Sequence, residues 1–183
     1  MTNNPQNCRA QSGSFDLYHE GHSGLLSINI ANQYLQGWLA STKPDIVQFM
    51  LGTTDIVASY TKMTGLMRAS NPRMKILVCT PATSKTSMRL LTLIYLADDR
   101  LIPLSFNGRG IDALNQRIPG WAIEQNSTNS PIIVADCSCS AGFTTSMLRD
   151  GVHPNDQGDQ VIARQLGPLL IKYVKDLIAE RGL

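Results

Sequence analysis

Three short apolar runs divide this chain and alternate with longer segments of a different pattern. The runs lie at residues 46–51, 74–78 and 131–136. Continuous apolar runs of this length, bounded by turn residues, are typical of strands that are buried in a parallel sheet. The pattern therefore predicts three buried strands.

Between the strands, apolar residues recur every three or four positions, as on one face of a helix. This spacing is found in residues 25–39, 61–69, 111–123 and 161–178. Strands that alternate with helices predict an α/β fold built on a parallel sheet. Residues 1–12 are polar and are expected to be disordered or loosely packed, and residues 13–183 to form one domain.

Composition excludes several classes of function. The chain has 183 residues, of which 43% are apolar and 16% charged, and its net charge is +2. These charges form no basic patch, so we expect no nucleic-acid partner. No apolar run approaches the roughly 20 residues that span a membrane. The first residues lack a signal peptide's basic and apolar regions, so none is expected in this chain.

The cysteines leave their pairing open. Cys8, Cys79, Cys137 and Cys139 fit neither zinc-site nor thioredoxin spacing. Cys137 and Cys139 are too close in sequence to pair well with each other. Disulfides to Cys8 are possible, but the sequence does not assign them.

The first histidines invite comparison with a metal site. His19 and His22 flank Glu20 and Gly21. A zincin helix needs two histidines four positions apart, whereas these are three apart with a glycine between them. We therefore expect no metal. The acid–base chemistry expected of residues 150–156 needs no organic cofactor either.

The most informative stretch is residues 150–156, Asp-Gly-Val-His-Pro-Asn-Asp. A histidine that is held by a carboxylate at one ring nitrogen can act as a general base with the other. Asp150 lies three residues before His153, close enough to be that partner within a tight loop. A plainer interpretation is a polar turn in which Asn155 or Asp156 caps the last helix.

Residues 150–156 resemble the last sequence block of the SGNH (GDSL-like) hydrolases, and in particular of carbohydrate esterase family 3, the acetyl xylan esterases. Further similar stretches are residues 19–24, 43–47, 51–56, 115–119 and 140–145. The resemblance extends from Gly13 to the end of the chain, with one gap. It implies a flavodoxin-like three-layer α/β/α sandwich that is truncated at its N-terminus.

The resemblance also implies roles for individual residues. Asp150 and His153 correspond to two members of a Ser-His-Asp triad, in which His153 is the base. The backbone N–H of Gly24 and the side chain of Thr54 correspond to oxyanion-hole donors. The family has Asn where Thr54 stands, and a Thr hydroxyl has a shorter reach. Loss of one such donor costs about 10²–10³ in rate. A plainer role for residues 53–55 is to cap the next helix.

The family's nucleophile belongs to a Gly-Asp-Ser block on its first strand, and this sequence contains no Gly-Asp-Ser. The chain is expected to begin beyond that block, which leaves its nucleophile unknown. The nearest serines are Ser12, Ser14 and Ser23. Because the family's first strand is expected to be missing, the strand at 46–51 should be an unpaired sheet edge.

The resemblance implies a secreted carboxylic ester hydrolase that acts on a small ester or an acetylated plant cell-wall polysaccharide. Activity of this chain is expected to be impaired without the nucleophile block. The alternative is a non-catalytic scaffold or a carbohydrate-binding pseudoenzyme. The sequence leaves the oligomeric state open.

Residues 79–99 match no part of the family and are predicted to form an atypical insertion that packs poorly. They include a strongly apolar stretch, residues 90–96. One interpretation is an added helical hairpin or lid. The other, which we favour, is translated intron sequence, because the two flanks would join as ordinary family sequence without it.

Overall fold

A computed structural model describes residues 2–3, 18–19, 25–51, 56–81, 109–150 and 153–182. The centre of the fold is a parallel sheet of β3 (Ile46–Phe49), β4 (Lys75–Cys79) and β5 (Ile132–Ala135), in the order β3-β4-β5. Val47 lies opposite Ile76, which in turn lies opposite Ile132. All three predicted strands are therefore confirmed.

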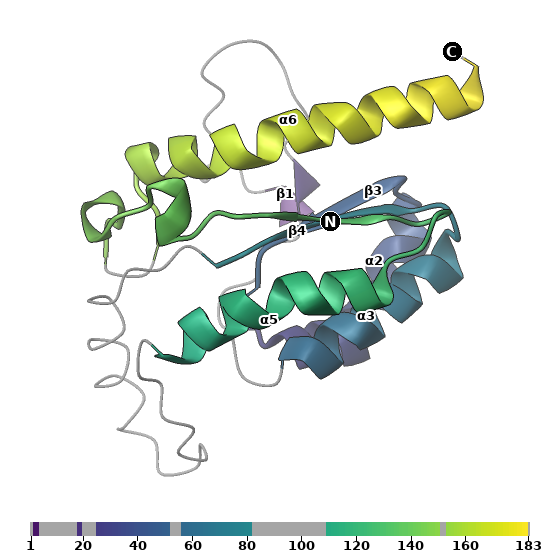
Figure 1. Ribbon diagram of the computed structural model, residues 1–183. Helices are drawn as coiled ribbons and strands as arrows, with labels where there is room; N and C mark the ends of the chain where they lie inside the picture. Colours follow the sequence, from purple (N-terminus) through teal and green to yellow (C-terminus); the bar gives the residue numbers. More distant parts are fainter. Residues whose placement is uncertain are drawn as a thin grey trace.

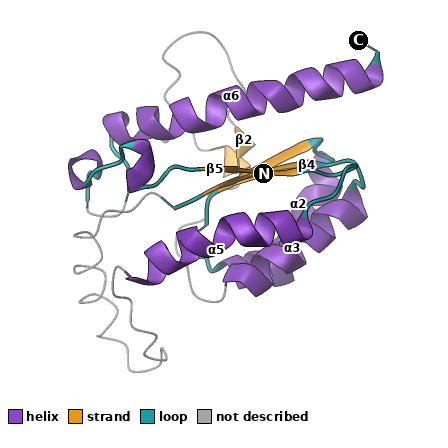
Figure 2. Ribbon diagram, viewed as in Figure 1, coloured by secondary structure: helices purple, strands orange, loops and turns teal. Residues whose placement is uncertain are grey.

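Helices cover both faces of this sheet (Figure 1). On one face lie α2 (Leu35–Thr42), α3 (Ile56–Ser70) and α5 (Arg109–Gln125). Two short elements, α1 (Ser27–Asn29) and η1 (Ile30–Tyr34), lead without a break into α2. On the other face lies α6 (Asp156–Arg181). Figure 2 shows the strands between these two helical layers, so the predicted three-layer α/β/α sandwich is confirmed.

The central strand β4 joins the two halves of the core, because all five of its residues are buried. Successive side chains of a strand point to opposite faces. Ile76 and Val78 belong to the cluster beneath α2, α3 and α5, whereas Leu77 and Cys79 belong to the cluster beneath α6. Burial on both faces explains why four of the five residues of β4 are apolar, Lys75 being the exception.

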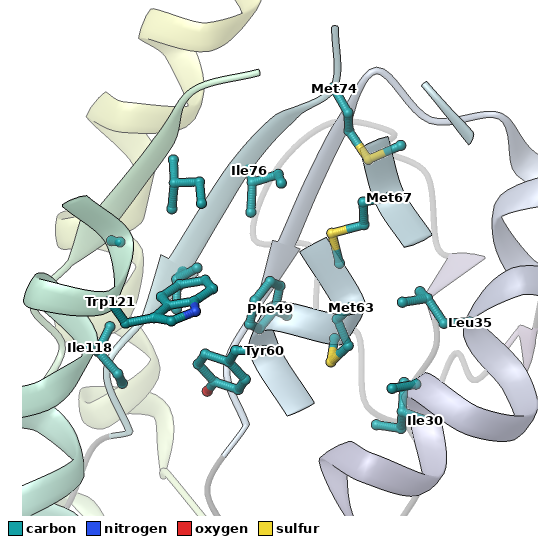
Figure 3. Close-up of a cluster of buried hydrophobic side chains, with 14 of the residues drawn as sticks. Ile30, Leu35, Phe49, Tyr60, Met63, Met67, Met74, Ile76, Ile118 and Trp121 are labelled. Carbon is teal, nitrogen blue, oxygen red and sulfur yellow. The ribbon is translucent and has the colours of Figure 1, made fainter. Parts of the chain in front are cut away.

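Three aromatic rings lie within the larger cluster (Figure 3). The Tyr60 ring meets Phe49 and Trp121 edge-on, with centroid distances of 4.9 and 5.3 Å. Such pairs add about 0.5–1.5 kcal/mol to the effect of burial. The Tyr60 hydroxyl also donates to the Leu51 carbonyl at 2.6 Å. The core thereby holds the chain just beyond β3, next to the segment that carries Thr54.

The strand β3 is more exposed than its apolar sequence predicted. Of its four residues only Phe49 is buried, and Met50 just beyond it is 37% exposed. Within the described residues β3 pairs with β4 alone and so forms one edge of the sheet. An edge strand lacks a neighbour on one side, which accounts for this exposure.

The N-terminal prediction differs from the structure at four residues. Thr2–Asn3 (β1) pairs antiparallel with Tyr18–His19 (β2). We expected the first pair to be disordered or loosely packed, and the apolar pattern predicted no strand at residues 18–19. Backbone pairing of this length needs no apolar periodicity, so the sequence carried no signal for it. No helix of the described segments is both long and apolar enough to cross a membrane.

The predicted insertion at 79–99 is wrong at its start. Cys79 ends β4, and Thr80 and Pro81 are buried beyond it. The Thr80 hydroxyl accepts from the Cys137 N–H at 2.9 Å, and the Pro81 carbonyl accepts from Asn115 at 3.2 Å. Cys79 is therefore part of the sheet, and the next two residues pack against the chain beyond β5 and against α5. Residues 82–99 lie outside the described residues.

A disulfide joins Cys79 to Cys137, a pairing that the sequence left unassigned. Both cysteines are fully buried. Cys79 ends β4 and Cys137 follows β5 by two residues, so the bond ties two neighbouring strands at their carboxyl ends. It encloses a sequence separation of 58 residues. Cys139 is exposed and lies outside this disulfide, and Cys8 lies outside the described residues.

We expect Cys137→Ser to lower the free energy of unfolding by about 2–5 kcal/mol, because the disulfide restricts the unfolded chain. Urea unfolding under non-reducing conditions measures the change. Cys139→Ser is the matched control and should have a much smaller effect. Equal effects of the two substitutions would contradict the stabilising role of the disulfide.

Candidate active site

The segment between β5 and α6 lies at the carboxyl end of the sheet (Figure 1). It contains two single-turn 3-10 helices, η2 (Cys139–Ala141) and η3 (Thr145–Met147). Beyond η3 the chain turns back on itself, with an antiparallel bridge between Leu148 and Pro154. Open α/β sheets bind their ligands at this carboxyl end.

Asp150 and His153 make two contacts within this turn. The Asp150 Oδ2 lies 2.6 Å from the His153 Nδ1, and the Asp150 Oδ1 accepts from the His153 backbone N–H at 2.7 Å. The carboxylate therefore holds both the backbone and the ring of the histidine. The predicted contact between these side chains is confirmed.

This contact determines what the imidazole can do. An ionised carboxylate only accepts hydrogen bonds, so the neutral ring carries its proton on Nδ1 and presents an unprotonated Nε2. The same pairing orients the base in Ser-His-Asp triads. The His153 side chain is 57% exposed, so a reacting group can reach the ring. The arrangement suits general-base chemistry.

The plainer interpretation of this stretch is also correct. Asn155 is the N-cap of α6, and its side chain accepts from the N–H groups of Gln157 and Gly158, each at 3.1 Å. A helix cap and a histidine–carboxylate pair therefore occupy the same short segment. The two interpretations do not exclude each other.

The sequence analysis missed a second carboxylate at this end of the sheet. Asp136, directly after β5, accepts from the Ser138 N–H at 2.9 Å and from the Ser138 hydroxyl at 2.6 Å. The hydroxyls of Ser140 and Thr80 donate to it as well. Burial alone would raise the pKa of Asp136, but these hydrogen bonds outweigh it and lower the pKa from its usual value of 3.8. Serines two and four positions after an Asp at a strand end were the available signal.

Other predicted site residues cannot be placed around this pair. The following lie outside the described residues: Gly24, Thr54, Ser12, Ser14, Ser23, Glu20 and His22. His19 is described only as part of the β2 backbone. Within the described ranges, no group of three or more His, Cys, Asp or Glu residues is arranged to hold a metal ion.

No protein-family model and no curated protein matches this chain. Solved structures do match. The chain is 44% identical to a carbohydrate esterase family 3 protein from Talaromyces cellulolyticus, with a TM-score of 0.75, and the match covers 93% of this chain and 77% of that one. It is 43% identical to a serine-to-alanine mutant of an acetyl esterase solved with an acetate ion, with a TM-score of 0.78 and coverages of 97% and 81%.

A Clostridium thermocellum family 3 carbohydrate esterase is 20% identical, with a TM-score of 0.61. The match covers 90% of this chain and 72% of that protein. At this identity the likeness bears on the fold alone. It agrees with the α/β/α arrangement described above.

We expect Asp136→Asn to destabilise the protein at neutral pH and progressively less in acid. A carboxylate whose pKa is lowered by folding stabilises the native state above its unfolded pKa, and this contribution disappears as the pH falls through the folded pKa. Urea unfolding of both proteins at pH 7 and at decreasing pH below 4 measures the difference.

The control for that experiment is Glu124→Gln, which removes one exposed carboxylate from α5. It should change stability little at either pH. If the deficit of Asp136→Asn stays constant with pH, ionised Asp136 does not stabilise this loop.

Proposed function

Since this chain belongs to carbohydrate esterase family 3, a family of SGNH hydrolases, we propose that it acts as a carboxylic ester hydrolase. The observation that carries the proposal is the 2.6 Å contact between the Asp150 carboxylate and the His153 Nδ1. This contact leaves Nε2 as a base at the carboxyl end of the sheet, where such sites lie.

The proposed reaction is acyl transfer through a serine ester. His153 Nε2 takes the proton of a serine hydroxyl while the serine oxygen attacks the ester carbonyl carbon. The proton then passes to the alcohol oxygen of the ester as the bond between that oxygen and the carbonyl carbon breaks. Water hydrolyses the acyl-serine in the same way, with His153 again taking and returning the proton. Asp150 holds the ring in position and stabilises the imidazolium.

Two further groups are proposed for the oxyanion that forms in each step. The Gly24 N–H and the Thr54 hydroxyl would donate to it, as the family resemblance suggests. The hydrogen bond from the Tyr60 hydroxyl anchors the Leu51 carbonyl, three residues before Thr54 in the sequence. Which serine attacks is not assigned.

The proposed substrate is an acetyl ester, in particular one carried by a plant cell-wall polysaccharide such as xylan. Two observations support this choice. One matching structure is described as an acetyl esterase with an acetate ion, and the other as a carbohydrate esterase. In addition, the His153 ring is more than half exposed, which suits an ester that projects from a large molecule. An extracellular location is proposed from the family alone.

We expect the 183-residue polypeptide to hydrolyse short-chain aryl acetates far more slowly than a family member that contains Gly-Asp-Ser. Its sequence contains no Gly-Asp-Ser, so the usual acyl-serine cannot form. The test fuses to it the nucleophile-bearing segment of the matching acetyl esterase. Turnover should appear with the serine present and disappear in the serine-to-alanine fusion.

The outcomes of this experiment separate the candidate functions. Robust activity of the unfused chain, lost in His153→Ala, would mean that another nucleophile has taken the role, with Ser14 and Ser23 as the first candidates. A folded serine fusion without activity would instead favour a non-catalytic scaffold.

In the active fusion, Asp150→Asn should reduce kcat much more than it changes KM. An amide at this position donates to Nδ1 and so favours the wrong tautomer, which costs about 10⁴ in serine-protease triads. Steady-state kinetics measures the change. Asp156→Asn, a neighbouring exposed carboxylate at the start of α6, is the control. Similar losses in both variants would show that general charge, rather than the Nδ1 contact, is responsible.

A further inference from the structure

Asn155 makes more hydrogen bonds than a helix cap requires. Capping needs only an acceptor, and Oδ1 supplies it for two N–H groups of α6. The same carboxamide also donates, from Nδ2 to the Ser146 carbonyl at 2.8 Å. The Asn155 backbone N–H donates to the Met147 carbonyl, again at 2.8 Å. Asn155 therefore links the first turn of α6 to η3.

These bonds form the base of a short two-stranded turn. From base to tip it contains the Asn155–Met147 bond, the Leu148–Pro154 bridge, and a bond from the Arg149 N–H to the His153 carbonyl at 2.9 Å. The Asp150–His153 pair lies at the tip. Because the pairing is antiparallel, a shift of register at the base would move Asp150 relative to His153.

Close packing holds the base against α6. A Cβ on Gly158 would lie 2.6 Å from the Met147 carbonyl oxygen and 3.0 Å from the Pro154 Cβ. It would also lie 2.9 Å from the ring of Phe143, which is almost fully buried. No other residue fits at 158 without movement of the backbone. The helix and the turn are therefore in direct contact, and Asn155 supplies the polar part of that contact.

We propose that Asn155 is a positioning residue for the Asp150–His153 pair: its amide donor fixes the register of the turn that bears them. The role rests on the ester-hydrolase function proposed above. The positioning role requires both the Oδ1 acceptor and the Nδ2 donor of the Asn155 side chain. Ser, Thr or Asp would cap the helix comparably well but cannot place an amide N–H on the Ser146 carbonyl.

The test compares Asn155→Ser with Asn71→Ser. Asn71 lies at the opposite end of the sheet and has a similar double role, with Nδ2 donating to the Pro44 carbonyl at 3.3 Å and Oδ1 accepting from the Arg73 N–H at 3.0 Å. The control thus removes the same kind of donor far from His153. Thermal unfolding shows how each substitution affects stability.

The decisive measurement is the ¹⁵N NMR signature of the His153 ring, assigned with His153→Gln. In the natural sequence the neutral ring should be the Nδ1–H tautomer, with a slowly exchanging Nδ1 proton. Asn155→Ser should increase the exchange of that proton at least tenfold and populate the other tautomer. Asn71→Ser should change neither the exchange rate of the Nδ1 proton nor the tautomer of the ring. Unaltered ring signals in a folded Asn155→Ser protein would overturn the proposal and leave Asn155 as a helix cap alone.

A second variant covers the case in which Asn155→Ser fails to fold. Asn155→Asp is a strong N-cap that also lacks the donor, and it should perturb the ring in the same way. An unperturbed ring in that variant would equally overturn the proposal.

The catalytic consequence is measured separately in the serine fusion. There Asn155→Ser should lower kcat by up to about 10²-fold, the cost of a misplacement of roughly 1 Å, with little change in KM. If no fusion is active, the proposed function fails, while the NMR experiment still decides the positioning role.

Discussion

Burial of β4 on both faces is the constraint on which the rest of the molecule depends. Ile76 and Val78 complete the cluster beneath α3 and α5, and Leu77 and Cys79 complete the cluster beneath α6. Among the described strands of this sheet, β4 alone is buried at every residue, whereas β3 and β5 are partly exposed. The disulfide from Cys79 to Cys137 attaches the loop beyond β5 to the end of β4. The segment that leads from β5 to the candidate site is therefore tied to the carboxyl end of the best-buried strand.

The helix α6 connects the sheet to the turn that bears His153, and it is held by contacts along its length. At its C-terminal end, Glu180 pairs with Arg73 and with Lys75, whose side chain is only 5% exposed. A buried ammonium needs such a partner, and the hydrogen bond from Lys75 lowers the pKa of Glu180. In its middle, the Tyr173 hydroxyl lies 3.0 Å from the Pro131 carbonyl and 3.2 Å from the Ile76 carbonyl and shares its one proton between them. At its start lies the turn with His153, so one helix both covers the sheet and supports the candidate base.

At the sheet edge, the local apolar pattern explains why a strand forms, whereas its neighbours in the fold determine how exposed it is. Apolar runs predicted β3 and β5 as well as β4, and all three form, because short apolar runs between turns favour strands in any parallel sheet. The run at 46–51 does not by itself indicate how many neighbours the strand has. Near the end of α6, Arg181 pairs with Asp45, just before β3. Ile171, Val174 and Ile178 of α6 remain 56%, 42% and 45% exposed. An apolar pattern thus predicts that a strand or helix forms better than it predicts how deeply that element is buried.

The sequence by itself determined the three strands of the parallel sheet, the helices that cover it and the Asp150–His153 contact, because these depend on near neighbours in the chain. A carboxylate three residues from a histidine can reach its ring within one turn, wherever the turn lies. Only the tertiary structure decided the partner of Cys79 and the hydrogen bond from Thr80 to Asp136, since strand pairing brings together residues more than fifty positions apart. It also decided that Asn155 ties the cap to η3, because that contact needs the chain to fold back on itself before α6. Short-range geometry is encoded in spacing, whereas long-range contacts follow from how the strands and helices pack.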